Sequence, residues 1–366
     1  MKTSNWKIRY LLTGLILTLF IVAACAPPGS APKEETITIG FLGPLTGDAA
    51  SYGLSILKGA QLAVKEAGLT DVKLVTEDSK CDPKEAVSAI NKLISVNKVQ
   101  AIVGEVCSGA TLAAAPIAEQ NKVVMISASS TSPEISKQLW VFRTVPSDAL
   151  QGAFGAELVA KQGYKKLAVL YSNEEYGLGF SKVLLEEFPK QEGGGEIVAN
   201  EAVERGTVDL RTQLTKIKAA SPDAIYIISN SPDSAVAALK QIKELGIEAA
   251  VYGSEGLKSD DIIKGAGNAA EGLIVTSVSV GNIGFITKHQ KEYGSEPGPF
   301  AAQAYDAYRA LAEALKAGAT TGEQIKEKLA AVEFDGASGH IKFDVNGDVS
   351  GNYDLYVVEE GKWVPG

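Results

Sequence analysis

Residues Ala101 to Thr131 have the sequence AIVGEVCSGATLAAAPIAEQNKVVMISASST. Its two apolar runs, Ala101–Val106 and Val123–Ser127, are short and rich in β-branched residues, whereas the intervening Gly109–Gln120 has the length and composition of a helix. A strand, a helix and a second strand in this order predict a βαβ unit with parallel strands. Polar residues follow each strand, and ligands bind outside the carboxyl ends of the strands in open α/β sheets. This stretch therefore predicts both an α/β fold and the edge of the sheet at which a site should lie.

The same alternation of strands and helices continues over most of the chain from Ile37 onward. We expect further strands at Ile37–Leu42, Val72–Glu77, Leu167–Ser172, Ile197–Val203, Ala224–Ser229, Ala250–Gly253 and Gly272–Val278. We expect further helices at Ser51–Ala67, Pro83–Val96, Ala149–Lys161, Gly179–Gln191, Leu210–Ala219, Ser234–Leu245 and Ser259–Lys264. Asp82, Pro83 and Glu85 predict a helix start with a capping box.

The chain of 366 residues is longer than a single compact core usually organises, so we expect two lobes. After the last of these strands come predicted helices and then a hairpin of Ile341–Asp344 and Val349–Tyr353 turned by Asn346-Gly347-Asp348; the helices are Phe285–Tyr293, Phe300–Lys316 and Gly322–Ala331. These C-terminal helices need a sheet against which they can pack, and we expect them to return to the sheet of the first lobe. We therefore assign residues 37–146 with 279–352 to an N-terminal lobe and 147–278 with 353–366 to a C-terminal lobe, with a hinge at the crossovers.

The N-terminus has the pattern of an export signal that ends at a cysteine. Lys2, Lys7 and Arg9 precede an uncharged apolar run, Leu11–Ala24, that is too short for a stable membrane span. The small residues directly before Cys25 resemble the lipobox of bacterial and archaeal lipoproteins, in which the cysteine is acylated. We expect residues 1–24 to be a signal peptide, Cys25 to be lipidated and residues 25–36 to form a flexible tether. The alternative is ordinary cleavage nearby that leaves a free thiol.

The charge of the exported chain bears on its partners. Removing three basic and no acidic residues with the signal changes the formal net charge from −9 to −12. Such a body is repelled by nucleic acid and by anionic lipid, so we expect no nucleic-acid partner and membrane contact only through the lipid anchor.

Two cysteines remain after Cys25 is set aside, namely Cys81 and Cys107. In an oxidising compartment we expect them to form a disulfide, which would constrain the unfolded chain by roughly 3 to 4 kcal/mol. The alternative is a pair of metal ligands, but the only histidines, His289 and His340, are distant in the sequence.

Each stretch that resembles a cofactor-binding or catalytic motif lacks a required residue or the required structural context. The stretch Gly265–Ala270 fits G-x-G-x-x-A but precedes a strand instead of following one, so we expect a turn. No phosphate-binding G-x-x-x-x-G-K-[ST] occurs, and Gly336–His340 lacks the last glycine of a nucleophile elbow. Asp344, Asn346 and Asp348 alternate like a calcium loop without its glycine and glutamate in register. We expect no catalytic residue, no metal and no cofactor, although counting residues leaves carboxylate chemistry open.

The polar residues after the strands form three candidate positions. Ser108 and Thr131 each lie between a strand and a predicted helix start, where hydroxyls and free N–H groups bind anions such as carboxylates; the alternative is that both only cap helices. Glu255, after a strand of the second series, suits a ligand ammonium; the alternative is a solvated loop acid. Tyr52 and Tyr176 are placed to close over a ligand, unless they only pack.

Taken together, these residues resemble the leucine/isoleucine/valine-binding protein family, the type I periplasmic solute-binding proteins of branched-chain amino acid ABC transporters. The resemblance runs from about Ile37 to the C-terminus. Its stretches are Gly43–Gly47, Cys81–Ala86, Gly104–Ser108, Ser129–Glu134, Glu175–Gly177 and Glu255-Gly256. It implies two Rossmann-like lobes with central parallel sheets, three hinge crossovers near Val145–Asp148, Val278–Gly281 and Tyr353, and the Cys81–Cys107 bridge.

The resemblance also implies roles for individual residues. Matching positions hold the ligand carboxylate at Ser108, Ser129 and Thr131 and the ammonium at Glu255. Aromatic residues matching Tyr52, Tyr176 and Phe300 line the pocket. The chain departs from the family at Asn230, where members known for this binding place a tyrosine near the ammonium. Amino-group recognition then rests on Glu255.

We therefore expect an extracytoplasmic, lipid-anchored and monomeric protein on the outer face of the cell membrane or in the periplasm. It would capture a branched-chain or related aliphatic amino acid by lobe closure and deliver it to an ABC permease with ATPase subunits. It would not be an enzyme. The alternatives are the same fold binding an amide, urea or aromatic acid, or a ligand sensor that feeds a signalling partner.

Overall fold

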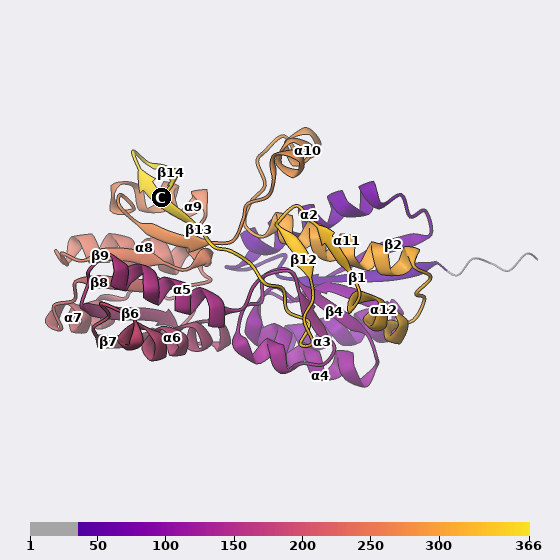
Figure 1. Cartoon of the computed structure of the whole chain (residues 1–366), viewed down its shortest axis with the longest axis horizontal. Helices are drawn as coiled ribbons and strands as arrows, with labels where there is room; N and C mark the ends of the chain where they lie inside the picture. Colours follow the sequence, from indigo (N-terminus) through magenta and orange to yellow (C-terminus); the bar gives the residue numbers. More distant parts are fainter. Residues whose placement is uncertain (1–35) are drawn as a thin grey trace, which may run out of the picture. The chain divides into compact units, whose positions relative to one another are not determined.

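The computed structural model describes residues 36–366 as an α/β protein with two large sheets (Figure 1). The predicted signal peptide, Cys25 and all of the predicted tether except its last residue lie outside the described residues. None of the helices in residues 36–366 combines the length and the apolar character that crossing a bilayer requires.

The first sheet is parallel throughout and has the strand order β2-β1-β3-β4-β5. Its strands are β1 Ile37–Gly43, β2 Val72–Asp78, β3 Ala101–Gly104, β4 Val124–Ser127 and β5 Val141–Arg143. The helices between them are α2 Ala50–Ala67, α3 Pro83–Ser95, α4 Ser108–Gln120 and the short 3-10 helix η2 Pro133–Lys137. The predicted βαβ unit is confirmed, because β3 and β4 pair in parallel with Ala101 opposite Val124. The three-residue strand β5 was not predicted.

The late helices return to this first sheet, as predicted (Figure 1). They are α10 Ile283–Tyr293, α11 Ala301–Lys316 and α12 Gly322–Leu329. Ala304, Leu311 and Leu315 of α11 belong to the same buried cluster as Ile39 and Phe41 of β1. We call the elements built on this sheet, α10 to α12 included, the first lobe.

The second sheet has the strand order β14-β13-β10-β9-β8-β6-β7. Its parallel strands are β6 Lys166–Ser172, β7 Glu196–Val203, β8 Ala224–Ile228, β9 Ala250–Gly253 and β10 Ile274–Ser277, and the antiparallel ones are β13 Asp354–Glu359 and β14 Lys362–Pro365. Its helices are α5 Asp148–Lys161, α6 Glu175–Glu187, η3 Phe188–Lys190, α7 Arg211–Ala219, α8 Pro232–Glu244, η4 Glu255–Leu257, α9 Asp260–Ala266 and η5 Gly267–Ala269. We call these elements the second lobe. The strands β13 and β14 were not predicted.

The predicted C-terminal hairpin is wrong in its pairing. His340–Lys342 forms β12 but pairs with β11, Glu333–Asp335, and no strand covers 349–353. Only the isolated bridge between Phe343 and Val349 remains of the expected ladder. The turn itself is as expected, because the Asp344 carboxylate accepts hydrogen bonds from the backbone N–H groups of Asn346 and Asp348. This local capping ends the ladder early.

The predicted start of α6 needs correction. Helix α6 begins at Glu175 and not at Gly179, because the Glu174 carboxylate accepts from the N–H groups of Tyr176 and Gly177. A side chain at Gly177 would collide with the Ser172 carbonyl oxygen, so this glycine permits close packing and does not break the helix.

At the start of α3, Asp82 caps the N–H groups of Lys84 and Glu85 as predicted. The Glu85 carboxylate does not complete a capping box and lies 3.5 Å from the Lys80 ammonium instead. The stretch Gly265–Ala270 precedes β10, as expected, but it forms the end of α9 and the 3-10 helix η5 and not a simple turn.

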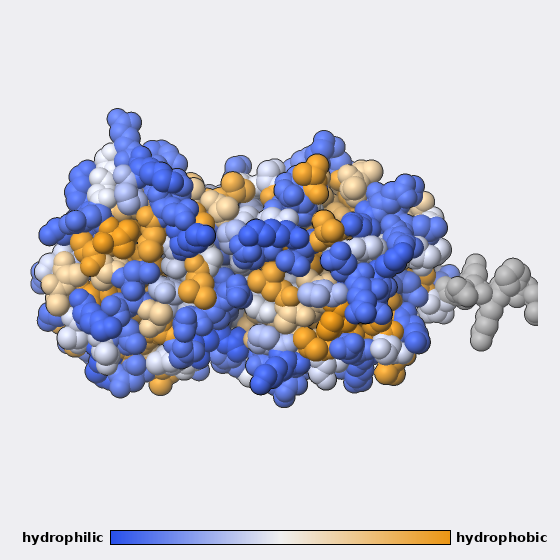
Figure 2. Space-filling view, turned by 90° about the horizontal axis from the view of Figure 1, so that it is seen from below, coloured by the Kyte–Doolittle hydropathy of each residue, from blue (hydrophilic) through white to orange (hydrophobic). Residues whose placement is uncertain are grey.

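The chain passes between the sheets three times, after β5, after β10 and ahead of β13. Hydrogen bonds join these passages: Thr144 Oγ1 donates to the Gln303 carbonyl (2.8 Å), and Gln303 Nε2 donates to the Ser279 carbonyl (2.9 Å). Tyr353 Oη donates to the Ser147 carbonyl at 3.1 Å. The residues at which one lobe gives way to the other stay a prediction. Figure 2 shows one face of the molecule, on which hydrophilic side chains surround smaller apolar patches.

Candidate functional site

A cavity of about 30 Å³ lies where loops after β3 and β4 of the first lobe meet η4 and α6 of the second. The residues that line it are Tyr52, Val106, Cys107, Ser108, Ser129, Tyr176, Asn230, Glu255, Gly256 and Phe300. All of the predicted ligand and pocket-wall residues are among them except Thr131. The structure therefore brings together residues that lie up to 248 positions apart, from Tyr52 to Phe300.

Ser108 is the first residue of α4 and is buried. The residue at the cap position is Cys107, which makes no side-chain cap. The Ser108 hydroxyl accepts a hydrogen bond from the Ser132 N–H at 3.2 Å instead, so it joins the two loops and still has a proton to donate. The alternative in which Ser108 only caps a helix is wrong.

The loop after β4 supplies Ser129 and Thr131. Ser129 Oγ donates to the Val106 carbonyl at 2.8 Å, which ties this loop to the one after β3. Thr131 is fully buried, and its hydroxyl has no hydrogen-bond partner among the described residues. It caps no helix, because Ser132 caps η2 through the Glu134 N–H. Thr131 is not among the residues that line the cavity, so its contact with a ligand stays a prediction.

Glu255 is the first residue of η4 and lies on the second-lobe side of the cavity. It is only 3% exposed, and its Oε2 has no hydrogen-bond partner among the described residues. Burial raises the pKa of this carboxyl to about 7, although its polar neighbours Tyr176 and Gln151 act in the opposite direction. The alternative of a solvated loop acid is wrong. A buried acid without a partner is suited to a cation.

The two predicted tyrosines reach the same loop of the second lobe. Tyr52, from α2 of the first lobe, donates its hydroxyl to the Gly256 carbonyl at 2.7 Å. Tyr176, from α6 of the second lobe, donates to Ser254 Oγ at 2.7 Å. Both rings are buried. Tyr52 therefore joins the lobes directly beside the cavity, which packing alone would not require.

Asn230 and Phe300 complete the predicted wall. Asn230 Oδ1 is buried and has no hydrogen-bond partner within residues 36–366. Phe300 precedes α11 with a φ of 60°, a left-handed conformation that costs a bulky residue free energy, and its ring centroid lies 6.4 Å from that of Tyr52. Phe300 and Glu255 also line a neighbouring cavity of about 800 Å³. These two residues therefore stand between the small cavity and a larger one.

Asp148 is a buried acid that interacts with Glu255 and that the sequence did not indicate. It is the first residue of α5, fully buried, and neither carboxylate oxygen has a hydrogen-bond partner in the described part of the chain. Burial raises its pKa well above the usual range, and the negative charge of Glu255 raises it further. In the sequence, an aspartate after a serine at a helix start indicates a cap, and Ser147 does cap α5. The charges of Asp148 and Glu255 therefore interact, although Asp148 does not line the cavity.

Arg205 is a second residue that the sequence did not indicate. It follows β7 of the second lobe, yet its Nη1 donates to the Cys81 carbonyl at 2.8 Å and its Nε lies 3.4 Å from Asp48 Oδ2. Both partners belong to the first lobe. Arg205 therefore links the lobes at a point outside the cavity.

Below the first-lobe loops lies the predicted disulfide between Cys81 and Cys107, with Cα atoms 5.5 Å apart. The alternative of a metal-binding cysteine pair is therefore wrong, and residues 36–366 contain no cluster of three or more metal-binding side chains. Glu105 is buried beside it and accepts from Ser79 Oγ and, at 2.5 Å, from the Cys107 N–H. Burial raises the pKa of Glu105 to about 8, so this acid is mostly neutral at pH 7.

The two sides of the cavity differ in chemistry. The first-lobe side presents the start of α4, whose first N–H groups have no intrahelical partner, together with serine hydroxyls. The second-lobe side presents Glu255 without a partner. A helix N-terminus with hydroxyls binds an anion, and a buried carboxylate binds a cation. The arrangement is complementary to a small zwitterion.

Comparison with known proteins places the chain in a family. Residues 36–362 match the family model described as periplasmic binding protein. A leucine-, isoleucine-, valine-, threonine- and alanine-binding protein of Pseudomonas aeruginosa is 32% identical over 93% of this chain and 94% of its own length.

Two solved structures resemble this one closely. A leucine binding protein of Thermotoga maritima has a TM-score of 0.85 and 31% identity over 90% of this chain and 97% of its own. A branched-chain amino acid transporter substrate binding protein of Streptococcus pneumoniae, solved with isoleucine, has a TM-score of 0.82 and 31% identity over 90% of this chain and 100% of its own. With this match over nearly all of its described residues, the chain belongs to the periplasmic binding protein family and has the type I fold.

Proposed function

We propose that the protein is the extracytoplasmic solute-binding component of an ABC importer and that it captures a branched-chain or related aliphatic amino acid. The single observation that carries this proposal is the pairing of an unpartnered, buried Glu255 with the serine-lined start of α4 across one small cavity. That pairing offers one partner to each charge of an α-amino acid. The relatives named above support the same ligand class: one is named for leucine, isoleucine, valine, threonine and alanine, one for leucine, and one was solved with isoleucine.

Individual roles follow from this arrangement. Ser108 and Ser129, with the N–H groups at the start of α4, would hold the carboxylate, and Thr131 would join them through its hydroxyl, which has no hydrogen-bond partner among the described residues. Glu255 would bind the ammonium with its buried carboxylate, which has an oxygen without a partner among the described residues. Phe300 and the two tyrosines would cover the aliphatic side chain, since their rings supply the apolar surface of the cavity.

Capture requires the lobes to part and close again. The cavity of about 30 Å³ has room for about one or two water molecules, which is too little for an amino acid. The contacts of Tyr52 with Gly256 and of Arg205 with Asp48 and Cys81 join the lobes and would break on opening. A ligand that bridges both lobes shifts the population toward the closed form, because only that form satisfies both of its charges.

The wider context of the proposal rests on the N-terminus. Lipid on Cys25 would anchor a monomer to the outer face of the cell membrane, and the closed form would dock on a permease whose ATPase subunits supply the energy. The protein would release its solute unchanged and is not proposed as an enzyme. Mass spectrometry of the mature N-terminus would reveal the acyl chains, and a mature chain without them would remove the anchor from the proposal.

A thermal-shift screen of the twenty amino acids tests the ligand class. We expect leucine, isoleucine or valine to raise the melting temperature most, because a ligand that binds only the folded state stabilises it by mass action. 4-Methylpentanoate, which is leucine without its ammonium, serves as the matched control and should have little effect. Stabilisation by benzoate or short amides, with none by aliphatic amino acids, would establish the alternative ligand class instead.

A further inference from the structure

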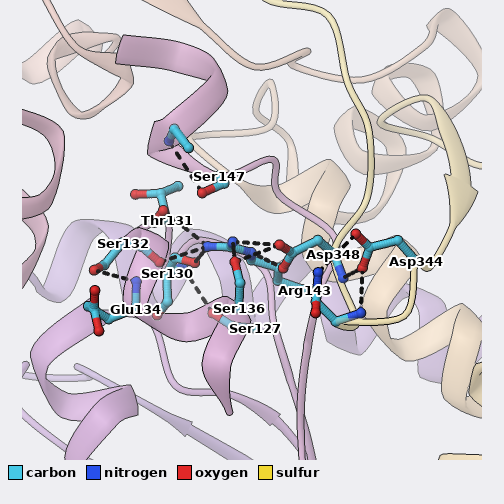
Figure 3. A network of polar contacts seen from close by, with 12 residues as sticks. Ser127, Ser130, Thr131, Ser132, Glu134, Ser136, Arg143, Ser147, Asp344 and Asp348 are labelled. Carbon is cyan, nitrogen blue, oxygen red and sulfur yellow. Dashed lines mark hydrogen bonds and ion pairs between the residues drawn. The ribbon is translucent and has the colours of Figure 1, made fainter. Parts of the chain in front are cut away.

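Arg143, at the end of β5, has a fully buried side chain that does not line the cavity. Its Nη1 donates hydrogen bonds to three consecutive carbonyls, those of Thr131 (3.0 Å), Ser132 (3.0 Å) and, more weakly, Ser130 (3.4 Å) (Figure 3). These carbonyls belong to the loop that also carries Ser129. One guanidinium therefore fixes the peptide groups of the loop on the side away from the cavity.

The remaining N–H groups of the Arg143 guanidinium, on Nε and Nη2, are held by an ion pair. Nε and Nη2 of Arg143 lie 2.6 and 2.9 Å from the two carboxylate oxygens of Asp348, in the fork geometry of an arginine and a carboxylate (Figure 3). Ser136 Oγ accepts from Nη2 at 2.6 Å and donates to Asp348 at 2.7 Å. Asp348 is itself fixed in its turn by Asp344. All of the donor groups of Arg143 thus have partners.

The same network reaches two passages between the lobes. Asp348 precedes the third passage, and the Arg143 N–H donates to the Gly347 carbonyl at 2.9 Å. The Thr131 carbonyl that accepts from Arg143 also accepts from the Asp148 N–H at 2.8 Å, directly after the first passage. The loop is therefore held between the two segments that must move when the lobes close.

We propose that Arg143, paired with Asp348, is a positioning residue that holds the loop of Ser129–Thr131 in the conformation that binds the ligand carboxylate. This inference rests on the proposed function and adds a residue that touches no ligand. Three carbonyls in a row, all turned toward one cation, leave the opposite side of the loop free to face an anion. Without Arg143 these buried carbonyls lose their partner, and the loop must turn to satisfy them elsewhere.

The test is calorimetric titration of the wild-type chain and of Arg143→Lys with the amino acid that the screen selects. Lysine keeps the charge but not the planar fork, so it cannot bind Asp348 through two atoms and the carbonyls at the same time. We expect affinity to fall by about tenfold, the usual size for losing charge-assisted hydrogen bonds. Arg309→Lys is the matched control in the same lobe, where Arg309 donates to the Asp335 carbonyl far from the network; its affinity should change by less than about twofold.

A double-mutant cycle separates positioning from a general loss of structure. If Arg143 acts through Thr131, then Arg143→Lys in a Thr131→Ala background should cost much less than it does in the wild type. Equal costs in both backgrounds would overturn the proposal. If Arg143→Lys fails to fold, Ser136→Ala removes one contact of the guanidinium and should weaken binding about twofold to threefold without unfolding the chain; unchanged affinity there would overturn it.

The outcomes also distinguish this inference from the proposed function. A wild-type chain that binds no amino acid overturns the proposed function and the inference with it. A wild-type chain that binds leucine, with an Arg143→Lys variant that is folded and binds equally well, overturns only the positioning role.

Discussion

The two sides of the cavity are built in different ways. On the first-lobe side, the hydroxyls of Ser108 and Ser129 already have backbone partners, and Arg143 fixes the loop behind them, although the Thr131 hydroxyl has no partner among the described residues. On the second-lobe side, Glu255 and Asn230 each have a buried oxygen without a hydrogen-bond partner among the described residues. The difference indicates that most of the first-lobe side is organised before the ligand arrives, whereas the Glu255 carboxylate on the second-lobe side is satisfied only when the ligand is in place. Such an asymmetry makes closure depend on the ligand.

The largest loss of affinity should come from a substitution on the second-lobe side of the cavity. Glu255→Gln removes the charge that faces the ligand ammonium while keeping the shape of the side chain. We expect affinity for the aliphatic amino acid to fall at least about 100-fold, because removing one partner of a buried charge pair costs 2 to 5 kcal/mol or more. Isothermal calorimetry measures this. Glu187→Gln, at an exposed ion pair with Lys190 in the same lobe, is the control and should leave affinity unchanged; equal binding by both variants would contradict the ammonium assignment.

A substitution on the first-lobe side of the cavity should lower the affinity less. Ser108→Ala removes one hydroxyl but leaves the N–H groups at the start of α4, so the carboxylate keeps part of its binding site. We expect a loss of about tenfold, the size of one hydrogen bond to a charged group. Titrating Ser108→Ala and Glu255→Gln with the same ligand shows which side of the cavity contributes more to the affinity. A larger loss for Ser108→Ala would reverse the comparison.

The pH dependence of binding should follow the pKa of Glu255, which is raised to about 7 by burial. A ligand ammonium favours the ionised carboxylate, so affinity is fully present above pH 7 and is lost as the pH falls through 7. Between pH 8 and pH 6 the ionised fraction, and hence the affinity, should drop by about tenfold. Asp148, whose charge interacts with that of Glu255, would broaden the transition. Glu255→Gln should abolish the pH dependence, and a persistent slope in that variant would assign it to another group.

The stability of the ligand-free protein should depend on pH in the direction opposite to the affinity. A carboxyl whose pKa is higher in the folded state than its ordinary 4.5 binds more protons when folded. Its contribution to the free energy of unfolding is therefore present below pH 4.5 and is lost as the pH rises to 7. Comparing denaturant unfolding of the wild type and Glu255→Gln across this range isolates the contribution.

The smallest effect should come from the contact between the lobes outside the cavity. Arg205→Ala removes the hydrogen bond to the Cys81 carbonyl and the ion pair with Asp48, both present only when the lobes meet. Because Arg205 is partly exposed, we expect affinity to fall only about threefold to tenfold, through faster dissociation. Arg211→Ala, at ion pairs within the second lobe, is the control. Equal dissociation rates for the two variants would show that Arg205 does not hold the lobes together.

Much of the fold could be predicted because its signals are local. Runs of β-branched residues such as those around Ala101 and Val124 are buried strands, and the breaks between them hold the turns. The strands β5, β13 and β14 were missed for a local reason too: β5 has only three residues, and Asp354–Pro365 follows a residue that we placed in a hinge. Their sheet positions depend on tertiary pairing that periodicity does not record.

The site was predictable where the polar residues follow strands, as for Ser108 and Glu255. Asp148 was not, because an aspartate at a helix start usually serves as a cap and its burial depends on the other lobe. Arg143 and Asp348 are 205 positions apart, and Arg205 and Cys81 are 124 apart. No local pattern joins such residues, so their contacts become visible only in the folded chain.

The central claim is that a zwitterionic aliphatic amino acid binds with its ammonium on Glu255. Calorimetric titration of leucine at pH 7, repeated in buffers that differ in ionisation enthalpy, tests it most directly. With the pKa of Glu255 at about 7, the account predicts one bound ligand per chain and the release of about half a proton on binding. Absence of binding by leucine, isoleucine and valine, or binding with no proton release, would contradict it.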